Sequence, residues 1–457
     1  MKNKVLIANR GEIAVRIIRA CRELGILTVA VYSKADRQSL HTKFADEAVC
    51  IGEGPASESY LDMNRILSAA IATGCNAIHP GYGFLAENSQ FAEIVENCGI
   101  KFIGPSSQVI KKLGDKITAR KIAQEVGVPV VMGSDGVVKN AQQGLKIARE
   151  IGFPVMIKAS SGGGGRGITI CYTEDEFLNG FEKTSLEAEK AFGDGSLYIE
   201  KYIQNPRHIE VQILADKFGH VIHLGERDCS VQRRNQKMIE EAPSPFIDEK
   251  TRQQMGEAAV KLAKHVGYEN AGTVEFIVDK DGNFFFIEMN TRIQVEHPVT
   301  EMVTGIDLVK EQLKIAYGNG LTIKQEEVVI DGHSIECRIN AEDPTQNFRP
   351  SPGVIENVVI PGGFGIRVDS HVYSQYEVPP YYDSMLGKLI VHGKNRREAI
   401  RKMRLAIEQF VISGIPTNIE FLYLIMHDPD FVRGVYDTRF LEQFMKKVKE
   451  ENDGIFG

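Results

Sequence analysis

The sequence predicts a multidomain protein of mixed α/β and α+β class. Its 457 residues are too many for one simple core and indicate two to four domains. Strand-like and helix-like segments alternate over about residues 1–113, which is typical of a parallel sheet flanked by helices. Residues 331–446 instead contain mainly short strands with turns, and an amphipathic helix at about 396–410.

The first segment begins with an apolar run at residues 5–8 and a helical pattern from Gly11 to Leu24. The turn between them lacks the GxGxxG pattern of dinucleotide binding, so we do not predict a dinucleotide cofactor. Further strands are expected at residues 28–32, 77–79 and 101–103, and further helices at 66–72, 91–97 and 251–266.

The composition excludes several classes of protein. With 54 basic and 61 acidic residues the net charge is −7, and general nucleic-acid binding would need clustered Lys and Arg. No apolar stretch approaches the roughly 18 residues that span a bilayer, and the N-terminal run is too short for a signal peptide. The seven cysteines are irregularly spaced without a CxxC pair. We therefore expect a cytoplasmic protein with reduced cysteines.

A glycine-rich loop joins two strand-like runs. Residues 153–158 form an apolar run ending in Lys158, residues 160–167 read SSGGGGRG, and residues 168–170 are again strand-like. A P-loop must open a helix, so this loop is not one. Its backbone N–H groups can still surround a phosphate, since glycines allow close approach, and Lys158 and Arg166 add positive charge. The alternative is a flexible surface loop.

Two carboxylates are predicted to face each other on a hairpin. Residues 273–278 and 284–288 flank a turn that contains Asp281-Gly282, a strong hairpin signal. If these two residues are the centre of the turn, Glu275 lies directly across from Glu288. Such like charges destabilise a sheet unless a cation offsets them, and Asn290 would share their face. The set suits Mg²⁺, and the alternative is a solvated face.

The string EMNTRIQVEHP at residues 288–298 alternates polar and apolar side chains. On an extended segment it would form one polar face that leads away from the hairpin. On that face Arg292 suits a planar anion, and Glu296 is a candidate general base. His297 would face the other way and is interpreted as structural.

Taken together, these strings resemble the biotin carboxylase family of the ATP-grasp superfamily over about residues 1–446. The matching strings are KVLIANRGEIAVRIIRAC, HPGYGFLAEN, GGGGRG, ERDCSVQRR, EMNTRIQVEHPVTE, ECRINAEDP and PPYYDSMLGKL. The resemblance implies a Rossmann-like parallel sheet in residues 1–113 and an ATP-grasp domain in residues 114–330. It also implies a glycine-rich lid at about 131–203, an antiparallel sheet domain at 331–446, and a charged tail at 447–457 that we expect to fray from Lys446.

The resemblance assigns roles position by position. Nucleotide contacts are implied for Lys116, Lys158, Gly164, Gly165, Glu200, Lys201, Ile203, His208, Gln232 and Asn235. Metal ligands are implied at Glu275, Glu288 and Asn290. The bicarbonate site would comprise Lys237, Arg292, Gln294, Val295 and Glu296, and the positions near biotin would be Tyr82 and Arg338. A homodimer contact is implied at Arg19, Glu23, Phe364 and Arg367.

The implied activity is carboxylation of biotin, carried on a biotin carboxyl carrier protein, with ATP, Mg²⁺ or Mn²⁺, and bicarbonate. Glu296 would deprotonate bicarbonate, Lys237 and Arg292 would offset charge as carboxyphosphate forms, and Arg338 would stabilise the biotin enolate. Carboxyltransferase subunits would be further partners. The parent complex is expected to be an acetyl-CoA carboxylase, with propionyl-CoA and pyruvate carboxylases left open.

The sequence differs from the family pattern at two positions, and two other functions are considered. Many members of the family carry His at Asn235 and Lys at Arg166, which puts a ribose or base contact in doubt at the first position. One alternative is another ATP-grasp ligase that forms an amide bond. The other is a nucleotide-binding subunit without activity, which would be expected to lack a metal ligand or the base.

Overall fold

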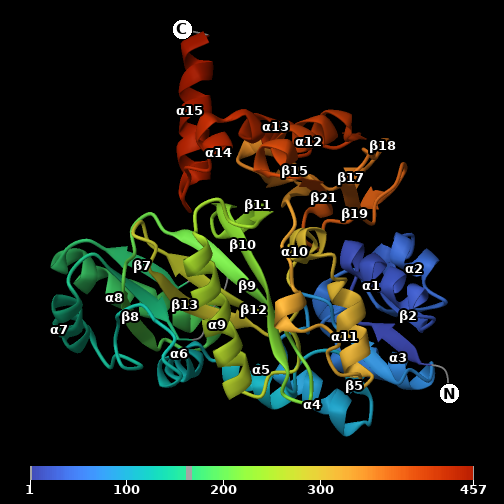
Figure 1. The fold of residues 1–457 in the computed structure, drawn as a ribbon, viewed down its shortest axis with the longest axis horizontal. Coiled ribbons are helices and arrows are strands. Elements are labelled where there is room, and N and C mark those ends of the chain that lie inside the picture. Colours follow the sequence, from blue (N-terminus) through green and yellow to red (C-terminus); the bar gives the residue numbers. More distant parts are fainter. Residues whose placement is uncertain (1–2, 161–166, 456–457) are drawn as a thin grey trace.

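The computed structural model describes residues 3–160 and 167–455. The molecule has three regions: the N-terminal region, a long central sheet with a small subdomain at one end, and a C-terminal region covered by helices (Figure 1). Gly164, Gly165 and Arg166 lie outside the described residues. In the part of the chain that the structure describes, no helix is both long and apolar enough to cross a membrane.

The N-terminal region contains a five-stranded parallel sheet in the order β3-β2-β1-β4-β5. The strands are β1 (Lys4–Ile7), β2 (Leu27–Ser33), β3 (Glu47–Gly52), β4 (Ala77–His79) and β5 (Lys101–Phe102). The helices between them include α1 (Gly11–Glu23), α3 (Met63–Ala72) and α4 (Ser89–Asn97). The predicted Rossmann-like parallel sheet is confirmed. Strand β3 was not predicted, because four of its six residues are exposed or half-buried polar and small side chains without a clear alternation.

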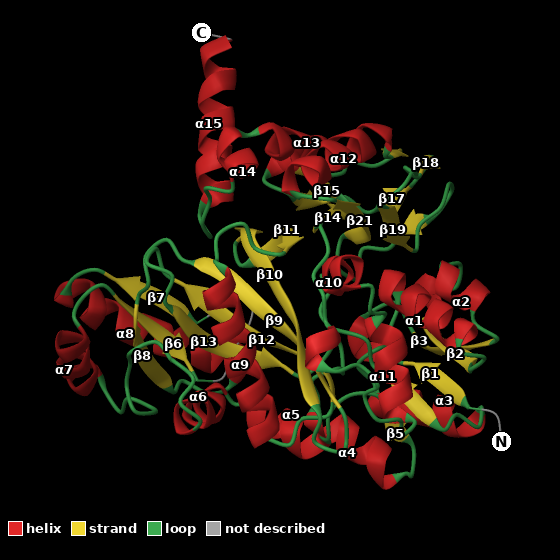
Figure 2. Ribbon diagram, viewed as in Figure 1, coloured by secondary structure: helices red, strands yellow, loops and turns green. Residues whose placement is uncertain are grey.

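One antiparallel sheet of eight strands runs from the centre of the molecule into its C-terminal region (Figure 2). Its order is β13 (Phe284–Asn290), β12 (Asn270–Val278), β9 (Arg207–Ala215), β10 (Val221–Arg233), β11 (Gln236–Ala242), β14 (His333–Asn340), β21 (Met385–Gly393) and β19 (Ile366–Ser370). Strand β11 pairs with β14, so the sheet continues from residues 114–330 into residues 331–446. This continuity fixes Arg338 on β14 relative to Lys237 on β11.

Two amphipathic helices cover this sheet. Helix α9 (Glu249–His265) packs on β9 and β10 through Met255, Ala259 and Leu262, close to the predicted range of 251–266. Helix α12 (Arg396–Gln409) packs on β21 and β14, close to the predicted range of 396–410. The charged tail predicted to fray from Lys446 instead continues helix α15 (Phe440–Ile455), whose Phe440, Leu441 and Phe444 are buried in the C-terminal core.

The small subdomain at the end of the sheet contains its own three-stranded sheet, in the order β7-β6-β8. Strands β6 (Val155–Ala159), β7 (Ile168–Cys171) and β8 (Leu197–Lys201) pack against helices α7 (Ala141–Ile151) and α8 (Glu174–Phe192). Lys158 pairs with Ile168 in antiparallel register, so the predicted strand–loop–strand arrangement around the glycine-rich loop is confirmed.

Candidate active site

A cleft of about 1440 Å³ lies where the three regions and the small subdomain meet. Its walls include the first residues of α1, the loop at Tyr82, and residues 381–385 of the C-terminal region. Of the predicted site residues, the cleft is lined by Tyr82, Lys116, Lys158, Glu200, Lys201, Ile203, His208, Gln232, Asn235, Lys237, Glu275, Glu288, Asn290, Arg292, Gln294, Val295 and Arg338. Glu296 lies directly behind this wall and is fully buried.

Glu275 on β12 is paired with Glu288 on β13, as predicted, but the turn is not the predicted one. Val278 pairs with Phe284, so five residues rather than two connect the strands. A bulge then occurs between the pairs Glu275–Glu288 and Phe276–Phe286, which leaves Ile287 without a partner. The longer loop shifts the pairing by one residue and the bulge shifts it back by one, so Glu275 again pairs with Glu288.

The hairpin presents oxygen donors of the kind that Mg²⁺ prefers. Burial alone would raise the pKa of Glu275, but Lys237 and His208 hold it well below its usual value, so the group is a carboxylate. The Asn290 amide nitrogen donates to Glu275 Oε1 at 2.8 Å, and its oxygen accepts from Arg292. A half-turn of this amide would place its oxygen beside Glu275. Glu275, Glu288 and Asn290 therefore fit a divalent cation.

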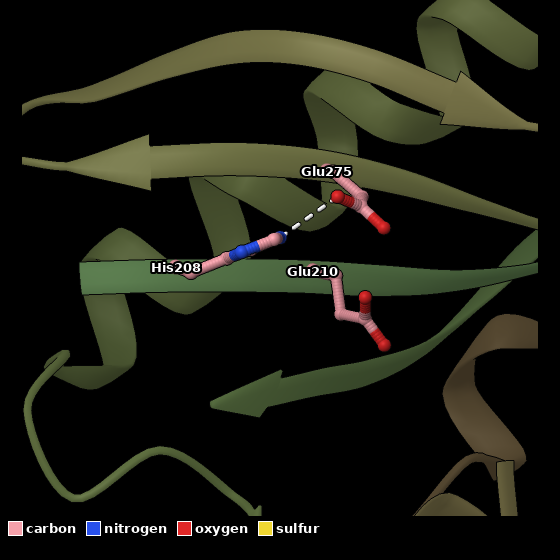
Figure 3. A group of neighbouring side chains, drawn as sticks. All are labelled: His208, Glu210 and Glu275. Carbon is pink, nitrogen blue, oxygen red and sulfur yellow. Dashed lines mark hydrogen bonds and ion pairs between the residues drawn. The ribbon is translucent and has the colours of Figure 1, made fainter. Parts of the chain in front are cut away.

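Two side chains of strand β9, a histidine and a glutamate, lie beside the hairpin. His208 and Glu210 are two residues apart and share one face of the strand, and His208 Nε2 lies 2.8 Å from Glu275 Oε2 (Figure 3). Glu210 is fully buried and accepts from Arg227 Nε at 2.5 Å. Glu210 was not predicted from the sequence. Its position in the run IEVQILA, where all residues except Glu210 and Gln212 are apolar, was the available signal.

Lys237 is surrounded by three carboxylates. Its Nζ lies 2.6 Å from Glu210 Oε2, 3.1 Å from Glu275 Oε1 and 2.6 Å from Glu296 Oε1. An ammonium group has three donors, so each of them has a carboxylate partner. Burial alone would lower the pKa of Lys237, but these carboxylates raise it well above its usual value. The centre of the cleft thus holds a permanent cation enclosed by three carboxylates, each of which has a further basic partner.

Glu296 accepts hydrogen bonds from two cations. Lys237 binds its Oε1, and Arg338 Nη2 lies 3.0 Å from its Oε2. Burial alone would raise the pKa of Glu296, but Lys237, Arg338 and Arg227 hold it well below its usual value. The segment around it is not the predicted extended strand, because β13 ends at Asn290 and helix α10 (His297–Thr304) begins directly after Glu296. His297 is buried, and its Nδ1 donates to the Gln294 carbonyl.

Arg292 crosses the cleft wall between three side-chain acceptors. Its Nε lies 2.9 Å from Glu87 Oε2, its Nη1 lies 2.8 Å from Gln294 Oε1, and its Nη2 binds Asn290. Glu87 was not predicted from the sequence, because it lies in the N-terminal region more than 200 positions earlier. These contacts hold the guanidinium plane at the cleft surface, where a planar anion can bind.

Arg338 and Tyr82 are each held by a glutamate that was not predicted from the sequence. Arg338 Nε donates to Glu240 Oε1 at 2.6 Å, in addition to its bond with Glu296. The Tyr82 hydroxyl donates to Glu12 Oε1, and Glu12 also pairs with Lys388 at 3.1 Å. Tyr82 and Arg338 both line the cleft, on opposite sides of the boundary between the N-terminal and C-terminal regions.

The predicted nucleotide-contacting residues lie on the walls nearest the small subdomain. Lys158 binds Glu200, and Lys116 Nζ lies 3.5 Å from Glu288 Oε2, close to the carboxylate hairpin. Lys201 donates to the carbonyls of Gly152 and Phe153, so its ammonium is already engaged by backbone. Asn235 has a φ of +64°, in the left-handed region. Asparagine adopts this conformation more readily than most residues, which suits its place in the β10–β11 turn.

An antiparallel sheet that carries a small three-stranded subdomain, with paired carboxylates and lysines in the cleft between them, defines an ATP-grasp enzyme. Comparisons with known proteins narrow this class. Residues 1–110 match the family model "Biotin carboxylase, N-terminal domain", residues 115–324 match "Carbamoyl-phosphate synthase L chain, ATP binding domain", and residues 336–443 match "Biotin carboxylase C-terminal domain". The chain belongs to the biotin carboxylase family.

Individual relatives agree with this assignment. The chain is 57% identical to biotin carboxylase 1 of Bacillus subtilis over 445 residues, which are 97% of this chain and 99% of the relative. It is 54% identical to a pyruvate carboxylase subunit of Methanothermobacter thermautotrophicus over 451 residues, 99% of this chain and 92% of the relative. Its fold matches the biotin carboxylase domain dimer of Hydrogenobacter thermophilus 2-oxoglutarate carboxylase, in complex with MgADP, ADP and bicarbonate. The TM-score is 0.94, with 55% identity and coverage of 97% and 98% of the two chains.

Proposed function

We propose that this chain carboxylates biotin on a carrier protein, using ATP and bicarbonate, by way of carboxyphosphate. The observation that carries the proposal is the position of Glu296, a buried carboxylate held between Lys237 and Arg338. A base held ionised beside two cations can accept a proton from a bound anion whose remaining charge those cations offset. The family assignment and the structures of relatives with MgADP and bicarbonate support the same reaction.

The first step joins bicarbonate to the γ-phosphoryl group. Glu296 takes the proton of the bicarbonate hydroxyl, and the freed oxygen forms a bond to the γ-phosphorus as the bond to the ADP oxygen breaks. Lys237 and Arg292, which both line the cleft, would offset the charge on the reacting oxygens. A magnesium or manganese ion held by Glu275, Glu288 and Asn290 would supply charge neutralisation on the phosphates. Lys116 and Lys158 would bind the nucleotide phosphates.

The second step transfers the carboxyl group to biotin. Carboxyphosphate breaks at its C–O bond to give CO₂ and phosphate, and the phosphate accepts the N–H proton of the biotin ureido ring. Arg338 would stabilise the resulting enolate oxygen, and Tyr82 would contact the ring. The nitrogen then forms a bond to CO₂. The glycine-rich loop between β6 and β7 would act as a lid that keeps water from these labile species.

We infer the wider setting from the same resemblance. The units would be residues 1–113, 114–330 with a lid at about 131–203, and 331–446. The chain would form a homodimer through Arg19, Glu23, Phe364 and Arg367, of which Phe364 is 95% exposed. Its partners would be a carrier protein and carboxyltransferase subunits.

All seven cysteines are free, which supports a cytoplasmic location. We propose acetyl-CoA carboxylase as the parent complex, although relatives named as pyruvate and 2-oxoglutarate carboxylase subunits are almost equally similar.

The proposal is tested by phosphate release from Mg-ATP and bicarbonate, with and without free biotin. We expect release to depend on bicarbonate and to increase with biotin. Stimulation by an amine or amino acid instead would identify an amide-forming ligase. Absence of hydrolysis under all these conditions would indicate a binding subunit.

A further inference from the structure

Lys388 is a fully buried lysine in the C-terminal region, and no role in the proposed reaction accounts for it. It stands in the run MLGKLIV on strand β21, where every neighbour is apolar or glycine. A buried ammonium is costly unless it is paired and hydrogen-bonded. The contacts of Lys388 therefore indicate why the fold places a charge there.

The contacts of Lys388 join all three regions of the protein. Its Nζ donates to the carbonyl oxygen of Val295 at 2.7 Å, in the loop between β13 and α10. It also lies 3.1 Å from Glu12 Oε1, at the start of α1 in the N-terminal region. Both side chains of this pair are at most 1% exposed. The ammonium group thus ties the C-terminal sheet to the N-terminal helix and to the cleft wall.

Both ends of this connection reach residues of the cleft. Val295 lines the cleft and directly precedes Glu296, so the position of its peptide group sets where the Glu296 side chain begins. At the other end, Glu12 accepts the Tyr82 hydroxyl, which fixes the Tyr82 ring at the cleft surface. Lys388 is also the direct cross-strand neighbour of Arg338. It is therefore linked to three side chains to which the proposed reaction assigns a role: directly to Arg338, through Glu12 to Tyr82, and through the Val295 carbonyl to Glu296.

We propose that the Lys388–Glu12 pair positions the Val295–Glu296 peptide and the Tyr82 ring relative to each other, so that the bicarbonate and biotin sites keep one fixed geometry. Lys388 is a positioning residue, because it touches neither substrate. The inference rests on the proposed function for its kinetic consequence, but its structural consequence can be measured without activity. A displacement of about 1 Å in a reacting group can cost on the order of 100-fold in rate.

The test uses the double variant Lys388→Met/Glu12→Gln in the full-length protein. Methionine keeps most of the lysine volume, and the glutamine avoids leaving Glu12 as a buried carboxylate without its partner. The control is Arg252→Met, which removes the partner of the buried Glu226 outside the cleft. It removes a partly buried ion pair without contact to the loop at residues 291–297, and because Glu226 keeps its charge it is a severe comparison for a purely structural loss.

Hydrogen–deuterium exchange gives the first result. In the double variant we expect the amides of residues 291–297 to exchange at least about tenfold faster, while most other protected amides change no more than in Arg252→Met. Unchanged exchange at 291–297 would overturn the inference, as would an equal increase throughout the chain. This readout does not depend on any enzymatic activity.

Kinetics give the second result, with the wild-type protein first shown to release phosphate in response to biotin. We expect kcat/KM for bicarbonate and for biotin to fall by about 10²-fold in the double variant, with the KM for ATP within about twofold. A rise in the KM for ATP as large as the loss in kcat/KM for the other two substrates would overturn the positioning role, because it would show a general disturbance of the cleft. If the wild-type protein shows no biotin response, the proposed function fails, and the exchange experiment still decides the inference.

Discussion

The Nζ atom of Lys237 lies 2.6 Å from Oε1 of Glu296, and this pair is enclosed at the centre of the cleft. The lysine has two further carboxylate partners, so Glu296 competes with Glu210 and Glu275 for one cation. Each of these carboxylates also has a second basic partner, which is Arg227 for Glu210, His208 for Glu275 and Arg338 for Glu296. The arrangement suits a reaction in which Mg²⁺ and two anionic substrates must be present together.

The substitution Glu296→Gln tests the base. It keeps the shape of the side chain and its hydrogen bond from Lys237 but removes the proton acceptor. Because a positioned base contributes about 10²–10⁴-fold, we expect kcat for bicarbonate-dependent phosphate release to fall by that factor. The measurement is phosphate release at saturating ATP and bicarbonate.

The matched control for this variant is Glu226→Gln, which alters another buried glutamate paired with an arginine, away from the cleft. It should retain most of the wild-type rate. Turnover of Glu296→Gln within about threefold of this control would contradict the assigned role.

The substitution Glu275→Gln tests the cation site. It removes one negative charge between two strands and leaves Lys237 and His208 with one carboxylate fewer. We expect the Mg²⁺ concentration for half-maximal rate to rise at least about tenfold, because even outer partners of a metal typically change affinity 10–100-fold. The measurement is the rate as a function of free Mg²⁺ at fixed ATP.

Chelation gives an independent check of the same site. Excess chelator should abolish the rate, and added Mg²⁺ or Mn²⁺ should restore it. An unchanged Mg²⁺ requirement in Glu275→Gln, with restored rates at ordinary concentrations, would remove this carboxylate from the ion site.

Features that depend on local pattern could be predicted from the sequence. The pairing of Glu275 with Glu288 follows from strand alternation around a turn. The predicted turn was wrong, but the pair still forms because the bulge at Ile287 restores the register. The segment after Asn290 could not be predicted in the same way. It alternates like a strand, but no neighbouring strand pairs with it, and the backbone turns into helix α10 instead.

Partners from distant segments were missed for a different physical reason. Lys388 stands alone in an apolar run, Glu12 and Glu240 have charged residues nearby in the sequence, and for all three nothing local shows which opposite charge each will meet. Their charges are tolerated only because the assembled fold brings the partners together from more than 90 positions away. A single charged residue inside an apolar strand is nevertheless a signal of a buried pair.

The Arg10–Asp36 pair predicts acid sensitivity in the N-terminal region. Arg10 Nε and Nη2 bind the two carboxylate oxygens at 2.6 and 2.8 Å, and the Tyr60 hydroxyl donates at 2.6 Å. Burial alone would raise the pKa of Asp36, but Arg10 lowers it to about 2 from an ordinary 3.8. The pair therefore contributes about 2 kcal/mol of stability above pH 4, which is lost as the pH falls through about 2.

The variant Asp36→Asn checks this contribution. It leaves Arg10 buried without its charged partner, so we expect a loss of about 3–5 kcal/mol in the free energy of unfolding at pH 7. Urea unfolding at pH 7 and at pH 3 should show the two proteins converging at the lower pH. A constant difference would show that Asp36 does not titrate with folding.

Glu240 predicts a pH dependence of the opposite sign, close to the reaction site. Burial raises the pKa of Glu240 from an ordinary 4.5 to about 7, against the opposing effect of Arg338. Glu296, Lys237 and Glu336 also face it, and Glu336 is its direct cross-strand neighbour. Between about pH 4.5 and 7 the folded protein holds a proton that the unfolded chain has released. This group therefore lowers the stability progressively as the pH rises through that range.

The variant Glu240→Gln keeps a hydrogen-bond acceptor for Arg338 and cannot ionise. Relative to wild type, its free energy of unfolding should increase as the pH rises from 5 to 7 and should change little above pH 8. The measurement is urea unfolding of both proteins at pH 5, 6, 7 and 8. A difference that is constant over this range, or that falls with pH, would mean that Glu240 is already ionised in the folded protein at pH 5. Arg338 would then be neutralised by two full charges, and its ability to stabilise a biotin enolate would require one of them to move away.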